Sequence, residues 1–330
     1  MTALEVAAAS ATESDTDVPA ALASAVTVCE AKAEAYRRDP YFRAAARELL
    51  DPAGTVEPGR LDGLLARTLL VFKPDAVAGR RVRPVLDGVA EAGFAVVGYT
   101  RFRFSPLLIR ELWRYQFNIA SADRAVVVDI LLPAADSLAV VLEDRGWRTG
   151  ALPAAYRLGD VKGPADPRLR RPEHLRSRLA APTTLFNFVH TADEPADLLR
   201  EAALLDLAAG SRLMAAAAAP RPSRPTDGAE LADVVSGMEA DLPAHDLDAL
   251  AATARLRARD RYADLLPGPD GQLPWRAVLD RCPHGRVPEE DCWDLLSIAT
   301  AQIESNVAGL RPLLPTIKSA DWRTAARRNA

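Results

Sequence analysis

Cysteine, histidine and aromatic residues are scarce in this chain, and long apolar runs are missing. Among 330 residues there are three cysteines and four histidines, and aromatic residues make up 6%. Because Cys29, Cys282 and Cys292 are far apart and odd in number, we expect no disulfide framework and a reducing, cytoplasmic location. No uncharged apolar run reaches membrane-spanning length, and the amino terminus lacks the basic and apolar regions of a signal peptide. We therefore expect no membrane partner.

The charge balance is mildly acidic. The formal net charge is -4, with 26% charged and 49% hydrophobic residues, a composition typical of globular proteins. An acidic balance argues against indiscriminate binding to nucleic acid, which needs a basic surface, so we expect no nucleic-acid partner. The length suffices for two domains, or for one domain with long flanks.

One histidine stands at the end of an apolar run. Residues 187–194 read NFVHTADE, where a strand should stop and a helix begin, and Glu201 follows eleven residues after His190. An imidazole can attack a phosphoryl group when one ring nitrogen is free and the other is held by a hydrogen bond. Glu201 is of the type that could hold it. The alternative is a histidine that merely satisfies the end of a strand.

A second signal lies far upstream. Residues 67–77 read RTLLVFKPDAV, an apolar run that ends in Lys73, Pro74 and Asp75. Proline stops a β-ladder, so the lysine before it should lie at the edge of a buried strand, where its ammonium group can hold a phosphate. For each such basic residue, the alternative is a solvated surface charge.

In this order, the Lys-Pro-Asp motif and the Asn-x-x-His motif with its downstream glutamate resemble the nucleoside diphosphate kinase family. The resemblance covers about residues 68–205. It implies an α+β fold, in which a ferredoxin-like βαββαβ antiparallel four-stranded sheet is covered by helices. It also implies that the terminal phosphoryl group of a nucleoside triphosphate passes through a phosphohistidine to a nucleoside diphosphate. The implied cofactor is Mg²⁺, bound through the nucleotide phosphates and not by a protein metal site. Family members assemble as homo-oligomers through this domain, but flanks of this length could block or replace those contacts, so the oligomeric state stays open.

The resemblance also assigns roles to individual residues. His190 matches the phosphorylated histidine and Glu201 its partner, while Lys73 is expected to serve both catalysis and phosphate binding. The other positions expected to bind the nucleotide are Tyr115, Arg157, Arg176 and Asn187. Arg157 matches with one residue of slippage, and for it the solvated-surface alternative carries equal weight.

Several positions depart from the family's pattern. Where the family has an aromatic ring that stacks on the nucleobase, residues 121–126 read SADRAV and contain no aromatic residue. Thr191 and Ala192 replace a glycine and a serine beside the histidine. Lys162 replaces a threonine in an arginine-rich loop over residues 160–183. Phosphate chemistry is therefore supported, whereas nucleobase recognition is altered, and a specialised acceptor is as plausible as a nucleoside diphosphate.

Two alternatives to this phosphotransferase stay open. The lost aromatic residue and the lost serine favour a catalytically degenerate kinase fold that serves as a binding or regulatory module. Retention of both His190 and Glu201 argues against that alternative. The other alternative uses the same pocket for a different phosphorylated substrate or for nucleotidyl chemistry.

The family resemblance marks out the central segment of the chain, and composition and periodicity divide the rest, which gives five segments in all. We predict a disordered tail at 1–18, an amino-terminal helical extension at 19–60, a nucleoside diphosphate kinase-like domain at 66–208, a linker at 209–227 and a helical carboxy-terminal domain at 228–330. Cys282, His284 and Cys292 lack a fourth ligand at an accepted spacing, so we expect no zinc site.

Alternation of apolar residues and turn signals predicts the individual elements. In the kinase-like domain the predicted strands cover 68–73, 94–103, 138–142 and 184–189. The predicted helices there cover 81–92, 106–118 with Ser105 as cap, 122–132, 145–157 and 194–206. Outside it we predict a helix over 20–50 with a break near Asp39, one from Asp246 to Leu266 and one from Pro288 to Leu310.

Overall fold

The structure is a computed structural model that describes residues 18–51, 54–283 and 286–328. The tail predicted at 1–18 therefore lies outside the described residues except for Val18, and so does His284 of the excluded zinc motif. No helix in the described part of the chain is long and apolar enough to cross a membrane.

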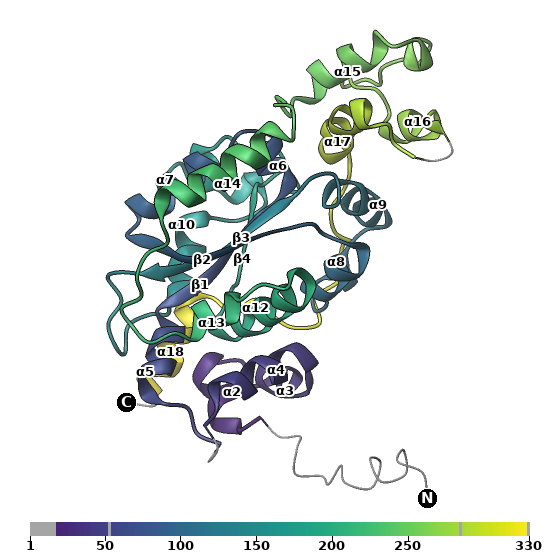
Figure 1. Cartoon of the computed structure of the whole chain (residues 1–330). Helices are drawn as coiled ribbons and strands as arrows, with labels where there is room; N and C mark the ends of the chain where they lie inside the picture. Colours follow the sequence, from purple (N-terminus) through teal and green to yellow (C-terminus); the bar gives the residue numbers. More distant parts are fainter. Residues whose placement is uncertain (1–17, 52–53, 284–285, 329–330) are drawn as a thin grey trace, which may run out of the picture.

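A four-stranded antiparallel sheet forms the centre of the molecule (Figure 1). Its strands are β1 (Arg67–Phe72), β2 (Phe94–Phe102), β3 (Ser137–Asp144) and β4 (Val189–Thr191), in the spatial order β2-β3-β1-β4. The central strands β1 and β3 are buried along their whole length. Helices connect β1 to β2 and β3 to β4, which makes this the ferredoxin-like order and confirms the predicted fold class.

The register of the sheet brings the two sequence motifs together. Strand β4 pairs antiparallel with β1, and His190 lies opposite Val71. The pairing continues past the end of β1, because the Lys73 amide donates to the Phe188 carbonyl at 2.9 Å. The Lys-Pro-Asp turn therefore lies next to the segment that leads into the histidine.

Helices cover both faces of the sheet (Figure 1). On one face lie α12 (Pro195–Ala209) and α13 (Leu213–Ala218), and on the other lie α7 (Val82–Glu91) and α10 (Ala154–Lys162). Helix α13 falls inside the segment predicted as a linker, where it packs against β2 and β3. Shorter elements of the domain are α6 (Pro74–Ala78), α8 (Pro106–Leu112), η2 (Phe117–Ile119), α9 (Ala122–Leu131), η3 (Pro167–Leu169) and α11 (Leu175–Arg178).

Amino-terminal helices pack on the outer side of α12. They are α2 (Ala20–Val26), α3 (Glu30–Arg38) and α4 (Pro40–Leu49), whereas α5 (Pro58–Leu65) packs against α13 and β1. The predicted break at Asp39 is confirmed, because this carboxylate caps α4 by accepting from the amides of Tyr41 and Phe42. A second break, not predicted, occurs at Thr27, whose hydroxyl accepts from the Cys29 amide and donates to the Glu194 carboxylate.

Three predicted elements of the domain were wrong in extent. Residues 145–153 form turns instead of helix, since Gly150 has a φ of 81° and Pro153 precedes the first residue of α10. The predicted strand at 184–189 is mostly an irregular turn, because Phe188 has a φ of 69° and only the last residue belongs to β4. Helix α8 has the predicted Ser105 cap but ends at Leu112, six residues early.

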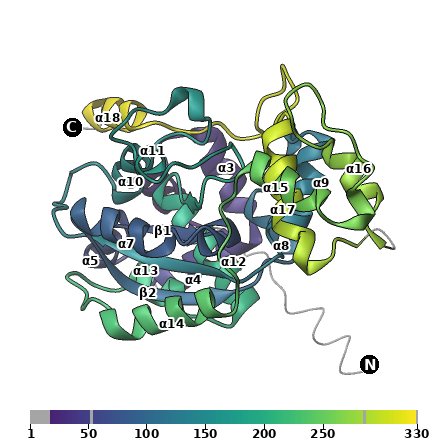
Figure 2. The ribbon, with the colours of Figure 1, turned by 90° about the horizontal axis from the view of Figure 1, so that it is seen from above.

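The carboxy-terminal region is helical apart from its loops and one long extended segment. Its helices are α14 (Gly228–Ala240), α15 (Ala249–Arg257), η4 (Asp260–Tyr262), α16 (Trp275–Asp280), α17 (Glu289–Gln302) and α18 (Ser319–Arg328). The cap of α15 is Asp248 and not the predicted Asp246, since the Asp248 carboxylate accepts from the Ala251 amide at 2.7 Å. Helix α17 ends at Gln302 and not at Leu310, and an extended segment then runs to α18 (Figure 2).

Candidate active site

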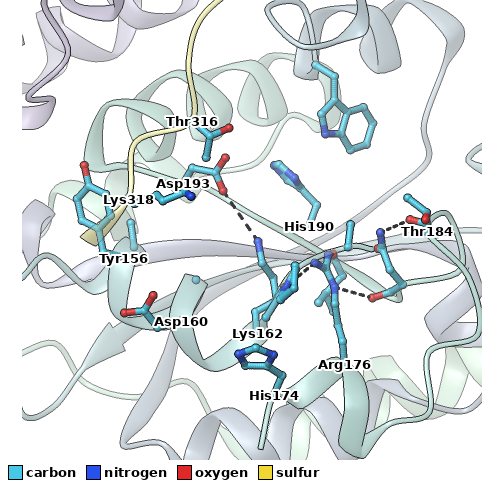
Figure 3. Close-up of a pocket in the computed structure, with 18 of the residues that line it drawn as sticks. Tyr156, Asp160, Lys162, His174, Arg176, Thr184, His190, Asp193, Thr316 and Lys318 are labelled. Carbon is cyan, nitrogen blue, oxygen red and sulfur yellow. Dashed lines mark hydrogen bonds and ion pairs between the residues drawn. The ribbon is translucent and has the colours of Figure 1, made fainter. Parts of the chain in front are cut away.

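A cavity of about 870 Å³ opens beside the edge strand β4. Its walls are α10 with the arginine-rich loop, the connection between α8 and α9, and the extended segment before α18. Four of the predicted site residues line it: Lys73, Arg176, Asn187 and His190. Figure 3 shows that the His190 ring shares this space with Lys162 and Asp193.

The Glu201 carboxylate forms a hydrogen bond with the His190 imidazole. The Nε2 atom of the imidazole lies 2.9 Å from Oε2 of Glu201, which projects from the buried face of α12. Burial raises the pKa of the Glu201 carboxyl, and the neighbouring His190 opposes that rise. Since a carboxylate only accepts hydrogen bonds, this contact places the proton on Nε2 and leaves a lone pair on Nδ1.

Lys73 and Arg176 tie the end of β1 and the arginine-rich loop to the segment before His190. The Lys73 ammonium donates to the Leu185 carbonyl at 2.6 Å and lies 3.3 Å from the Asp75 carboxylate. The Arg176 guanidinium donates to the carbonyls of Asn187, Gly163 and Val189, at 3.2, 2.8 and 2.6 Å. Burial lowers the pKa of both groups, to about 10 for Arg176. Each retains N–H groups for a ligand, because a guanidinium has five donors and an ammonium three.

Asn187 has an unused acceptor at the cavity. Its Nδ2 donates to the Thr184 carbonyl at 2.7 Å, whereas its Oδ1 is buried without a hydrogen-bond partner among the described residues. A buried acceptor left unpaired costs roughly 1–3 kcal/mol. A ligand hydroxyl or amine that entered the cavity would satisfy it.

The structure places Tyr115 outside the cavity. This residue does not line the cavity, and its hydroxyl donates instead to Asp39 at 3.0 Å. Because α8 ends at Leu112, the following turn sends Trp113 to the cavity and Tyr115 away from it. The Trp113 ring meets His190 edge to face at 5.3 Å.

Arg157 is also directed away from the cavity. Its guanidinium binds the Asp144 carboxylate at 2.6 and 2.9 Å and packs over the Phe94 ring. The preceding residue, Tyr156, lines the cavity in its place, and so does Lys162 at the other end of α10. A shift of one position on a helix turns a side chain by about 100°, which explains why a slipped match points elsewhere.

Lys162 adds a cation close to the histidine. Its ammonium donates to the Thr191 hydroxyl and lies 4.0 Å from the Asp193 carboxylate. Burial, followed by the positive charge of Arg176, lowers the pKa of Lys162 to about 8. This lysine occupies a position at which the family has a threonine. That departure from the family's pattern was the sequence signal for an additional cation in the cavity.

An aromatic ring does line the cavity, at a position where the sequence search did not look for it. Phe117 belongs to η2, before the segment that was searched. The guanidinium of Arg110 lies 4.3 Å from the centre of its ring, and that of Arg124 lies 5.9 Å away. The local sequence WRYQF contains three aromatic residues, and only the fold determines which of them face the cavity.

The residues around the cavity do not form a metal site of their own. In the described ranges no group of three or more histidine, cysteine or carboxylate side chains is arranged to hold a metal ion. The carboxylates that line the cavity are Asp160 and Asp193. This donor set fits a divalent cation that arrives on the phosphates of a nucleotide, and not one held by the protein alone.

The strand order and the histidine–glutamate pair define a ferredoxin-like α+β domain with a cation-lined cavity at its sheet edge. Residues 66–205 match the family described as nucleoside diphosphate kinase. This domain is thus a divergent member of the nucleoside diphosphate kinase family, flanked by additional helical regions.

Solved structures of the same family are similar to less than half of the chain. The nucleoside diphosphate kinase of Aquifex aeolicus is 24% identical, over 42% of this chain and 93% of that one, with a TM-score of 0.36. The enzyme of Pyrobaculum aerophilum is 18% identical, over 42% and 94%, with the same TM-score of 0.36. No curated protein sequence matches the chain.

Proposed function

We propose that the chain is a nucleoside diphosphate kinase-like phosphotransferase. The terminal phosphoryl group of a nucleoside triphosphate passes to His190 and then to a nucleoside diphosphate or a specialised acceptor. The observation that carries this proposal is that His190 Nε2 lies 2.9 Å from the Glu201 carboxylate. The same imidazole ring lines a cavity that several lysine and arginine side chains also line.

The first step is an in-line displacement at the terminal phosphorus. The lone pair of His190 Nδ1 forms the new N–P bond, the bond to the bridging oxygen breaks, and the nucleoside diphosphate leaves with that electron pair. The ring becomes positively charged, and the Glu201 carboxylate stabilises this charge through Nε2–H. In the second step a phosphate oxygen of the acceptor attacks the same phosphorus, and the N–P bond breaks to regenerate the neutral imidazole.

The cations of the cavity supply charge neutralisation. Phosphoryl transfer depends mainly on positioning and on electrostatic stabilisation of the phosphoryl oxygens. Lys73, Lys162 and Arg176 each have spare N–H donors and line the same space as the His190 ring. Mg²⁺ bound to the nucleotide phosphates would add further positive charge.

Two features are suited to the nucleoside. The unpaired Oδ1 of Asn187 can accept from a sugar hydroxyl, and the Phe117 ring offers an apolar surface for a base. A volume of about 870 Å³ lies within the usual range for cavities that hold small ligands. Phe117 thus gives base recognition a candidate that the sequence alone did not supply.

Labelling with γ-³²P-ATP tests the proposal. We expect an acid-labile, alkali-stable phosphoenzyme in the wild-type chain, discharge by nucleoside diphosphates, and none in His190→Ala. Calorimetry with ATP then separates the alternatives. Failure to bind any nucleoside triphosphate would support a binding or regulatory module, and binding without a phosphoenzyme would support different chemistry in the same cavity.

A further inference from the structure

The extended segment between α17 and α18, residues 303–318, contributes Asn306 and residues 316–318 to the lining of the cavity, and we call it the strap. Figure 2 shows it running from α17 to α18. It lies outside the matched domain of residues 66–205. On one side of the cavity it follows the connection between α8 and α9. There the Val307 amide donates to the Ile119 carbonyl at 2.8 Å, and the Leu313 amide donates to the Tyr115 carbonyl at 2.9 Å.

The far end of the strap is fastened to α10. The Ser319 hydroxyl, at the start of α18, donates to the Asp160 carboxylate at 2.8 Å. One turn later, the Trp322 ring lies 5.5 Å from the Tyr156 ring. Both Asp160 and Tyr156 line the cavity, so the strap is anchored on two of its walls. Between the anchors, Thr316 and Lys318 lie near Asp193 and Tyr156 (Figure 3).

The strap region contributes cations whose donors are free. Lys73, Lys162 and Arg176 already donate to protein oxygens, as described above. By contrast, the Lys318 ammonium and the Arg323 guanidinium, both exposed at the cavity, have no side-chain hydrogen bond or ion pair to any described residue. Of the lining carboxylates, Asp160 is engaged by Ser319 and Asp193 lies near Lys162. The lining of the cavity therefore includes two cations, Lys318 and Arg323, whose side chains have no ion-pair partner among the described residues; the nearby Asp321 carboxylate accepts from the Lys318 amide.

We propose that Lys318 and Arg323 bind the phosphate chain of the substrate and that the strap is a specificity-determining wall of the active site. This inference rests on the proposed function, and it names the ligand class for these two residues as a linear triphosphate chain. Free ammonium and guanidinium groups at an open mouth favour ligands with several adjacent negative charges. A triphosphate therefore gains more from Lys318 of the strap and Arg323 of α18 than a monophosphate does.

Calorimetric titration with inorganic triphosphate tests the strap proposal independently of nucleobase recognition and of phosphoryl transfer to His190. In the full chain, Lys318→Ala/Arg323→Ala should raise the dissociation constant about tenfold or more, because two charge-assisted contacts are lost. The matched control is Arg311→Ala, which removes an exposed positive charge from the strap outside the cavity and should leave binding unchanged. Inorganic monophosphate should bind more weakly and depend less on the two residues.

The outcomes of this experiment test the strap proposal separately from the proposed phosphotransferase function. Equal triphosphate binding by the wild type and the double variant, or no triphosphate binding by the wild type, would overturn the strap proposal. Triphosphate binding that depends on Lys318 and Arg323, together with no phosphoenzyme at His190, would support the strap and reject the proposed function. If the phosphoenzyme forms, the double variant should require a higher ATP concentration for half-maximal labelling, with an unchanged rate at saturation.

Discussion

The rings of Trp113 and His190 meet edge to face, with their centres 5.3 Å apart. Trp113 follows the last residue of α8, and Tyr115, two residues later, lies on the opposite side against Asp39 and Arg200. The ring that restrains the candidate nucleophile is therefore an indole. An edge-to-face contact of this kind contributes roughly 0.5–1.5 kcal/mol and limits the orientations of the imidazole.

Replacement of Trp113 should impair phosphoryl transfer more than replacement of Tyr115. Trp113→Ala removes the ring beside His190, and we expect the single-turnover rate of phosphoenzyme formation to fall by about tenfold or more, as reactive geometry is lost. Tyr115→Phe removes only the hydrogen bond to Asp39, so the rate should stay near that of the wild type. Rapid-quench labelling measures both rates, and the reverse order would show that Tyr115 belongs to the site.

Binding of triphosphate should weaken as the pH rises through the titration of Lys162. Burial and Arg176 lower the pKa of this lysine to about 8, so it is charged below that pH and neutral above it. We expect the affinity for inorganic triphosphate to decrease between about pH 7 and pH 9. Lys162→Arg keeps its charge and is the control, because titration of the ligand is common to both proteins. Parallel pH profiles for the two proteins would rule out a phosphate contact by Lys162.

Burial of the same lysine should lower the free energy of unfolding at neutral pH. Its pKa falls from 10.5 to about 8 on folding, so between these values the folded chain binds fewer protons than the unfolded chain, and stability rises with pH. Below pH 8 the penalty is fully present, at most roughly 3–4 kcal/mol for a shift of this size. Lys162→Met should therefore raise the free energy of unfolding in urea at pH 7. A destabilised Lys162→Met variant would indicate that the ammonium contributes to folding instead of function.

Docking of the amino-terminal helices on α12 should depend on Asp39. Its carboxylate lies 2.7 Å from Nε of Arg200, and both side chains are almost fully buried. Breaking such a pair leaves an uncompensated buried guanidinium, so Asp39→Ala should lower the free energy of unfolding by about 3–5 kcal/mol. Arg38→Ala, which removes an exposed ion pair with Glu34, should cost less than about 1 kcal/mol. Comparable losses in urea denaturation would contradict this account.

Local signals predicted much of the fold and part of the site. The end of β1 before Lys73 follows from Pro74, and the pairing of His190 with Glu201 follows from a strand, a turn and a helix that are contiguous in sequence. Ser105 was recognised as a cap because Ser-Pro before an apolar run is a local pattern. These features need few residues and no distant partner.

Features that depend on distant partners were not predictable in this way. The segment before β4 was read as a strand, but Arg176 and Lys73 bind its carbonyls and Phe188 adopts a left-handed conformation there. Whether Tyr156 or Arg157 reaches the cavity depends on the rotation of α10 against the sheet. Nothing in the local sequence of residues 303–318 indicates that this segment returns to a cavity formed by the preceding domain.

The central claim is that Glu201 holds Nε2 of His190 and leaves Nδ1 to receive the phosphoryl group. ³¹P NMR of the alkali-denatured phosphoenzyme, with peptide mapping by mass spectrometry, tests it most directly. We predict a single phosphohistidine at residue 190, substituted on Nδ1, with a strongly reduced yield in Glu201→Gln because an amide cannot balance the positive ring. Phosphate on Nε2, on another residue, or on none would contradict the account.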